Sequence, residues 1–478
     1  MVPAPEDAPP KAEASPFWWR GALGAALLAL LVVGLHRSQR SPEAARSAAA
    51  ARLEVETLWA AKAAHLSGWR ADVPGIPDGL IPSLRRLAAL QPRAVRHRRT
   101  LLIVQALSGD PGWRQTADSL HREPALRSLY PGGERALWFD AFGHDALSRA
   151  QAARIIEALE RMDLGWYRLV VHERVFARAG MPDEARESRR LATRWLRRLA
   201  PLAVLMLGAL IWGTGLLAVG LYAVVTRRVR PPLGWVLAHT APGRLDRQRA
   251  DVLTTVFLVY LLTFLAVKAV GPPIAAAVGA GSSDRVAQVV SVVMMAVVLA
   301  VPLLAYKRLC RVYGMGAEHL GVRRGGGMAE VLWGVATYCA ALPLVLGATV
   351  ASAWVFGEKG SPLHPIVNEM PALADPLVLY LLVLQAVVLA PVSEELMFRG
   401  AFFGGLASRV GGVGAIIVTS AAFALLHPQL PVGFAGLFIL GAAMCGLYAV
   451  RGSLVGSMVL HGVNNGAAFL LLWALSAS

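Results

Sequence analysis

Residues 376–400 read PLVLYLLVLQAVVLAPVSEELMFRG, and this stretch decides the fold. Its residues 376–393 contain no charged side chain, and about 20 mainly apolar residues suffice for a helix to cross the roughly 30 Å hydrocarbon core of a membrane. Two glutamates and an arginine then follow without a turn signal. An ionisable group inside a membrane span costs about 2.5–3.5 kcal/mol on insertion scales. The stretch therefore predicts a membrane helix whose polar groups serve a function.

The composition of the 478-residue chain extends this prediction to the whole protein. Hydrophobic residues make up 56% and charged residues 16%, against about 45–50% and 25% in soluble domains, and the mean hydropathy is +0.51. Three cysteines exclude a disulfide scaffold, and the 46 glycines follow no collagen period. We assign the net charge of +16 to arginines that flank membrane spans beside anionic lipid, and we expect no nucleic-acid partner.

Nine apolar runs are candidates for membrane spans. They lie at about 17–35, 199–226, 252–270, 286–306, 328–356, 377–398, 411–427, 432–450 and 453–476. The predicted fold class is therefore all-α, a polytopic transmembrane helix bundle of about eight to nine spans with an inserted soluble helical domain. We interpret the first run as an uncleaved signal-anchor, because no A-x-A cleavage site follows it.

Composition shifts divide the chain into four predicted parts. Residues 1–36 are an N-terminal tail and the first span, and residues 37–198 form a charged, soluble, helical domain. Its segment FARAGMPDEARESRRL is typical of a helix–turn–helix unit in a helical repeat, although no second copy recurs at a fixed period. Residues 199–370 are membrane helices of the core, and residues 371–478 are the membrane helices that carry the polar groups.

The short connections indicate the orientation of these spans. The connections 227–251 and 307–327 are rich in arginine, whereas the alternate connections are poor in Lys and Arg. The positive-inside rule places the basic connections in the cytoplasm, and the parity of the spans then places the 37–198 domain outside it. We expect a multi-pass protein with an extracytoplasmic 37–198 domain.

Polar side chains recur at fixed spacings in three apolar segments near the C-terminus. The motifs are E-E-x-x-x-R at Glu394, Glu395 and Arg399, F-x-x-x-H at Phe423 and His427, and H-x-x-x-N at His461 and Asn465 with Asn464 beside it. Residues four apart share one face of a helix, so Glu395 can pair with Arg399 while Glu394 points elsewhere. A carboxylate without a cation beside it suits a general base.

The position of His427 does not fit a simple crossing. Glu394 and His461 fall at similar predicted depths, whereas His427 ends the run 411–427 on the opposite side. We therefore expect residues 400–415 to form an interfacial or re-entrant piece, or the helix 411–427 to be strongly tilted.

In their order and spacing the three motifs resemble the CPBP family of intramembrane endopeptidases. This family includes type II CAAX prenyl proteases and bacteriocin-processing or immunity proteins, and it is also called the Abi family. The resemblance covers about residues 375–476 and leaves out the 37–198 domain. It implies that residues 371–478 are the catalytic part of an all-helical core, and that a glutamate-activated water hydrolyses a peptide bond within the membrane.

Amide hydrolysis needs a base, donors for the developing oxyanion and exclusion of bulk water. The predicted catalytic residues are Glu394 as the base, His427 as the group that orients the water, and His461 and Asn465 as oxyanion donors. The predicted supporting residues are Glu395, Arg399, Asn464 and Phe423. This hypothesis requires Glu394 to lie within a side chain's reach of His427 or His461.

No cofactor is expected, but a zinc-dependent alternative stays open. Glu394, His427 and His461 could supply one carboxylate and two imidazoles to Zn²⁺ and leave a position for water. An asparagine next to the second histidine fits an oxyanion site better than a zinc ligand.

The predicted function is an intramembrane endopeptidase that acts on a membrane-anchored protein or peptide and contacts membrane lipid. One alternative is a catalytically inactive scaffold whose 37–198 domain recruits a protein partner. A proton-coupled transporter is the other, but the two halves show no inverted repeat. The Ala- and Arg-rich, Lys-poor composition indicates a bacterium with high GC content. We therefore expect the bacterial cytoplasmic (inner) membrane, and a sorting-type or leader-type peptide as substrate.

Overall fold

The computed structural model of the chain is all-α in the part that it describes. It describes residues 23–31, 42–69, 77–91, 94–120, 133–143, 145–226, 245–278, 283–322, 327–356 and 375–476. The predicted first span is described only over residues 23–31, which are helical, so its length stays a prediction. Of the basic connections, residues 227–244 and 323–326 lie outside the described ranges. The orientation of the spans and the inner-membrane location therefore also stay predictions.

Within the described residues, seven helical segments are long and apolar enough to cross a membrane. They are Pro182–Gly220, Arg247–Ala277, Asp284–Tyr313, Gly327–Phe356, Pro376–Leu425, Phe434–Arg451 and Leu454–Leu471. This makes the protein a multi-pass membrane protein, but it does not confirm a count of eight or nine spans. The difference arises partly because the predicted spans 377–398 and 411–427 fall within one helical segment, Pro376–Leu425, which is interrupted at Gly411.

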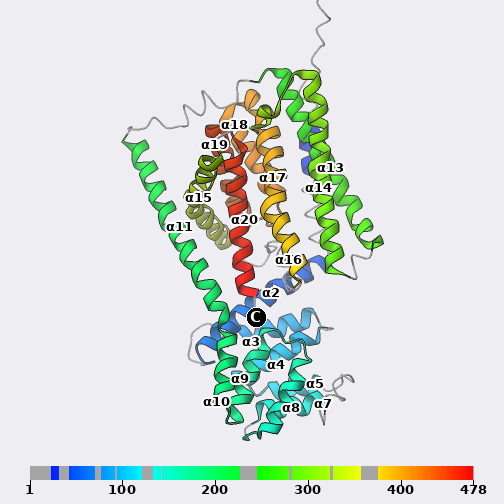
Figure 1. Cartoon of the computed structure of the whole chain (residues 1–478), viewed down its shortest axis with the longest axis vertical. Helices are drawn as coiled ribbons and strands as arrows, with labels where there is room; N and C mark the ends of the chain where they lie inside the picture. The colour runs from blue at the N-terminus through cyan, green and yellow to red at the C-terminus, as the bar shows by residue number, and fades with distance from the viewer. Residues whose placement is uncertain are drawn as a thin grey trace, which may run out of the picture. The chain divides into compact units, whose positions relative to one another are not determined.

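The chain divides into two compact units. The first, which we call the membrane unit, consists of Met1–Ser38, Gly208–Ser361 and Ala372–Ala467, and the second consists of Gln39–Leu207, Pro362–Pro371 and Ala468–Ser478. Helices that lie in the membrane unit or extend into it are α11 (Arg194–Val225), α13 (Arg247–Ala277), α14 (Asp284–Tyr313), η2 (Ala317–Leu320), α15 (Gly327–Phe356), α19 (Phe434–Arg451) and α20 (Leu454–Ser476). Figure 1 shows α13 and α14 as long neighbouring helices of this unit.

The segment between Pro376 and Leu425 is a run of helices that changes its type of turn. It consists of α16 (Pro376–Val383), the π-helix η5 (Leu384–Leu389), α17 (Ala390–Glu395), the π-helix η6 (Leu396–Phe403) and α18 (Gly404–Leu425). Wider π turns inside α-helices occur frequently at functional sites. The short helix α17, which carries both glutamates, is thus bounded by a π turn at each end.

Helix α18 reverses direction at Gly411, whose φ of 73° and ψ of 166° are not helical. Phe398 and Phe423, on opposite sides of Gly411 at nearly equal distances along the chain, have ring centroids 5.5 Å apart. The two arms therefore lie against each other as an antiparallel hairpin. At 1.5 Å per residue the returning arm 412–425 is only about 21 Å long, which is shorter than the roughly 30 Å hydrocarbon core. This hairpin, and not a full crossing, returns His427 towards the level of Glu394.

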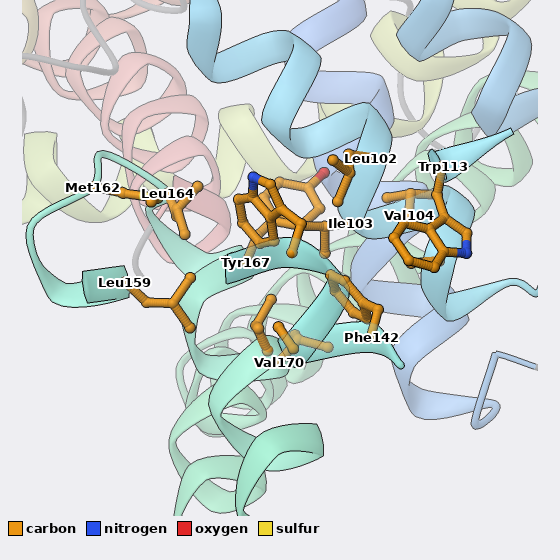
Figure 2. Packing of buried hydrophobic residues seen from close by; sticks show 14 of the residues in the cluster. Leu102, Ile103, Val104, Trp113, Phe142, Leu159, Met162, Leu164, Tyr167 and Val170 are labelled. Atoms are coloured by element: carbon orange, nitrogen blue, oxygen red, sulfur yellow. The ribbon is translucent and has the colours of Figure 1, made fainter. Parts of the chain in front are cut away.

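The second unit has a hydrophobic core of its own. Its helices are α2 (Pro42–Leu66), α3 (Pro77–Leu90), α4 (Val95–Leu107), α5 (Trp113–Leu120), α7 (Gly133–Phe142), α8 (Arg149–Glu160), α9 (Trp166–Arg178) and α10 (Pro182–Ala192). Figure 2 shows Ile103, Phe142 and Val170 from three of these helices gathered in the core. The buried guanidinium of Arg99 donates to Glu134 over 2.7 Å. The interpretation of residues 37–198 as a soluble, extracytoplasmic domain stays a prediction.

Candidate functional site

The backbone before Pro391 contains carbonyl groups that lack their usual α-helical donors. Proline has no N–H, so the carbonyl of Val387, four residues earlier, has no α-helical donor. The residue before Pro391, Ala390, donates its N–H to the Gln385 carbonyl, five residues back, instead of to the Ala386 carbonyl. The carbonyl of Ala386 thus loses its α-helical donor, and the donor five residues on would be Pro391 itself. The π turn η5 leaves the carbonyls of Ala386 and Val387 available to another helix.

Helix α20 approaches these two carbonyls closely. A Cβ atom at Gly462 would lie 2.9 Å from the Val387 carbonyl oxygen, so only glycine allows this distance. One turn later, Asn465 Nδ2 donates to the Ala386 carbonyl oxygen over 2.9 Å. The neighbouring Asn464 Nδ2 donates to Asn465 Oδ1 over 3.2 Å. The amide of Asn465 is therefore held against η5 with one N–H bound and its second N–H free to donate elsewhere.

A buried ion pair fixes the centre of the site. Arg399 Nη1 donates to Glu395 Oε1 over 2.9 Å, and both side chains are fully buried. The predicted pairing of Glu395 with Arg399 therefore forms, even though Arg399 lies in the π-helix η6. Arg399 Nη2 also donates to the backbone carbonyl of Gly441 in α19 over 3.3 Å.

His461 lies between the two glutamates. Its Nδ1 donates to Glu395 Oε1 over 2.9 Å, and its Nε2 faces Glu394 Oε2 at 3.9 Å. The 3.9 Å separation is too long for a direct hydrogen bond. Glu394 Oε2 has no hydrogen-bond partner among the described residues, and the Glu394 side chain is 23% exposed. Glu394 therefore lies within a side chain's reach of His461, as the hypothesis from the sequence requires.

The aromatic ring of Phe423 connects the remaining predicted residues. The Arg399 guanidinium lies 4.6 Å from its centroid, and the rings of His427 and His461 lie 4.5 and 5.7 Å from it. His427 Nδ1 donates to the Phe423 carbonyl oxygen over 2.7 Å, which leaves Nε2 as the ring nitrogen that is free to contact a water or substrate. His427 also interacts electrostatically with Glu394 and His461.

The structure thus joins six of the eight sequence-predicted residues through contacts: Glu394, Glu395, Arg399, Phe423, His427 and His461. The other two, Asn464 and Asn465, contact each other and the Ala386 carbonyl. Sequence reasoning missed two backbone groups, the carbonyl of Ala386, which holds Asn465, and the carbonyl of Gly441, which holds Arg399. Pro391 was a signal for the first, since it removes a backbone donor within a span. No signal in the sequence points to the second.

The described residues do not fit a metal site. They contain no group of three or more His, Cys, Asp or Glu side chains arranged to hold a metal ion. We derive no step through zinc.

Comparisons with known proteins agree with the position of this site. No curated protein and no solved structure matches the chain. A family model described as "Type II CAAX prenyl endopeptidase Rce1-like" matches residues 376–467, which contain all eight side chains. Residues 376–467 are therefore similar to the Rce1-like family, which is a family of intramembrane proteases.

Proposed function

We propose that the protein is an intramembrane endopeptidase in which Glu394 activates a water molecule. The observation that carries this proposal is the pair Glu394 Oε2 and His461 Nε2, 3.9 Å apart, with the glutamate oxygen lacking a partner among the described residues. A water molecule beside this pair can contact both atoms within hydrogen-bond distance. The neighbouring Glu395 is neutralised by Arg399, so Glu394 is the carboxylate left to act as a base.

The reaction follows from these positions. The water oxygen attacks the peptide carbonyl carbon while its proton passes to Glu394, and a tetrahedral oxyanion forms. The carbon–nitrogen bond then breaks, and the proton returns from Glu394 to the leaving amine. His427, whose Nδ1 proton is bound by the Phe423 carbonyl, accepts a hydrogen bond from the water at Nε2 and orients it.

Two groups are candidates to stabilise the oxyanion. Asn465 has one N–H left after its bond to Ala386. His461 donates from Nδ1 to Glu395, so its Nε2 can donate only when the ring carries both protons. Asn465 is therefore the stronger candidate, and His461 contributes an oxyanion donor only in its doubly protonated form.

The substrate class follows from the location of the site. Glu394, Phe423 and His461 lie in segments that are long and apolar enough to cross a membrane, and His427 lies two residues beyond one of these segments. A substrate must therefore present its peptide bond from within or beside the membrane. We propose a membrane-anchored protein or peptide of the sorting or leader type in a bacterial cytoplasmic membrane. The 37–198 domain, on the extracytoplasmic side, would recruit or present it.

A proteome comparison tests the proposal. Cells that express only Glu394→Gln should accumulate uncut membrane-tethered precursors, and the new chain ends made by wild type should be missing. Glu318→Gln is a matched control, because Glu318 is 65% exposed on η2 and makes no contact with the site. Equal sets of chain ends in wild type and Glu394→Gln, at equal expression, would leave the scaffold as the better explanation. Cleavage of an identified precursor that stops on chelation and resumes with Zn²⁺ would contradict the metal-free mechanism.

A further inference from the structure

A second polar cluster lies beside the site, and the mechanism above does not use it. Gln385 belongs to the π-helix η5, and its side-chain amide contacts two residues of α14. Gln288 Nε2 donates to Gln385 Oε1 over 2.9 Å, and Gln385 Nε2 donates to Ser291 Oγ over 2.9 Å. Gln288 is buried, with only 6% of its surface exposed. These three polar side chains satisfy one another inside two membrane segments.

Packing alone does not require polar side chains here. Gln385 stands between Leu384 and Ala386 in an otherwise apolar run, where a leucine would fill the space at lower insertion cost. The cluster instead connects η5 to α14 by hydrogen bonds at Gln385. Gln385 directly precedes Ala386, whose carbonyl accepts a hydrogen bond from Asn465. The backbone of Gln385 is also part of the π turn, since its carbonyl accepts the Ala390 N–H.

We propose that Gln385 is a positioning residue for Asn465. By fixing the rotation of η5 against α14, its amide keeps the Ala386 carbonyl pointed at α20 and so holds the Asn465 amide in place. Without this tie, the π turn can shift its hydrogen bonds, and the Ala386 carbonyl turns away. The functional consequence rests on the proposed peptidase, in which Asn465 stabilises the oxyanion. The structural link itself does not depend on it.

The sequence offers a direct readout of this link. The chain contains three asparagines, Asn368, Asn464 and Asn465. Protein labelled with ¹⁵N only at asparagine therefore gives three pairs of side-chain amide signals, one pair for each NH₂ group, and Asn465→Ala and Asn464→Ala identify two of the pairs. In Gln385→Leu we expect the Asn465 signal to shift and to exchange faster with solvent, because its bond to Ala386 is weakened. Gln288→Leu should produce the same change in a smaller degree.

Two variants control for nonspecific loosening. Arg285→Gln removes the 2.5 Å ion pair between Arg285 of α14 and Asp375, the N-cap of α16. It weakens contact between the same two segments without touching η5, so the Asn465 signal should stay in place. Gln385→Glu keeps an acceptor for Gln288 and should preserve most of the wild-type signal. An Asn465 signal that is unchanged in Gln385→Leu, or that shifts equally in Arg285→Gln, overturns the proposal.

Kinetics with a precursor identified by the proteome comparison give the second test. Gln385→Leu should lower kcat about tenfold with little change in KM, and it should have no further effect when combined with Asn465→Ala. Gln385→Glu should recover most of kcat. Additive effects of Gln385→Leu and Asn465→Ala overturn the positioning role. If no precursor exists, the peptidase proposal fails, while the amide signals still decide whether Gln385 positions Asn465.

Discussion

His461 Nδ1 donates to Glu395 Oε1 over 2.9 Å, and the same oxygen accepts from Arg399 Nη1. A single buried carboxylate oxygen thus joins α20 to the segment that carries Glu394. Because this bond fixes which ring nitrogen of His461 holds a proton, it also determines that Nε2 is the nitrogen that faces Glu394. Glu395 is therefore a positioning residue as well as a partner for Arg399.

The first prediction separates these two roles of Glu395. Glu395→Leu should destabilise the protein by about 3–5 kcal/mol, because it leaves the buried Arg399 without its counter-ion. The double variant Glu395→Leu/Arg399→Met should regain much of this stability, since an apolar pair replaces a buried ion pair. It should remain inactive, because His461 has lost its acceptor. Thermal unfolding in detergent and precursor cleavage measure the two effects. A double variant that is both stable and active would show that Glu395 serves only to neutralise Arg399.

Asn465 gives the second prediction. Removal of one oxyanion donor lowers the rate of other hydrolases by about 10²–10³, so Asn465→Ala should lose activity to that degree with a small change in KM. Asn464 is the matched control, since it is the adjacent amide and only donates to Asn465 Oδ1. Asn464→Ala should lose less than tenfold. Equal losses in the two variants would indicate that the pair stabilises helix packing and not the oxyanion.

The pairing of residues within one helix was predictable from the sequence, whereas the backbone between motifs was not. The spacing of Glu395 and Arg399 gave a correct ion pair because an i,i+4 contact depends only on local geometry. The π turn η5 meets α20 through the carbonyls of Ala386 and Val387, and this tertiary contact has no local sequence pattern. Pro391 shows that a backbone donor is missing but not which group replaces it.

The reversal at Gly411 is a second feature that hydropathy alone could not predict. The sequence RVGGVG interrupts a long apolar run, and hydropathy alone reads the two sides as separate spans. The structure shows a hairpin whose second arm is too short to cross, and this shape brings Phe423 against Phe398 and Arg399. The depth of His427 in the membrane therefore could not be obtained by counting residues along the predicted spans. Residues 400–415, for which we expect an interfacial or re-entrant piece, contain the reversal at Gly411.

The close contact between α20 and η5 gives the third prediction. A Cβ at Gly462 would lie 2.9 Å from the Val387 carbonyl oxygen, whereas one at Gly466 would make ordinary contacts of 3.9 Å with Val387. Gly462→Ala should therefore push α20 away from η5, cost about 1–3 kcal/mol through overpacking, and reduce activity. Gly466→Ala should change neither the stability nor the activity by much. Thermal unfolding and precursor cleavage of both variants provide the comparison, and similar behaviour of the two would contradict the close approach at Gly462.

The last prediction concerns the second unit and its response to pH. Burial, with a smaller contribution from Arg168, lowers the pKa of His172 from 6.5 to about 4. Its Nε2 is buried without a hydrogen-bond partner among the described residues, so the folded state disfavours the charged ring. Between pH 6.5 and 4 the unfolded chain binds a proton at this residue and the folded chain does not. Stability should therefore fall as the pH drops through this window and then level off, by about 2–3 kcal/mol for this group.

Hydrogen exchange of the α9 amides in the full-length, detergent-solubilised protein measures this loss. After correction for the intrinsic exchange rate, protection of α9 in wild type should decrease from pH 6.5 to 4. His172→Phe removes the titrating ring and should flatten the profile. A residual slope is expected from His97, whose pKa burial also lowers to about 4. Parallel profiles for wild type and His172→Phe would contradict the prediction, because they would show that folding does not lower the pKa of His172.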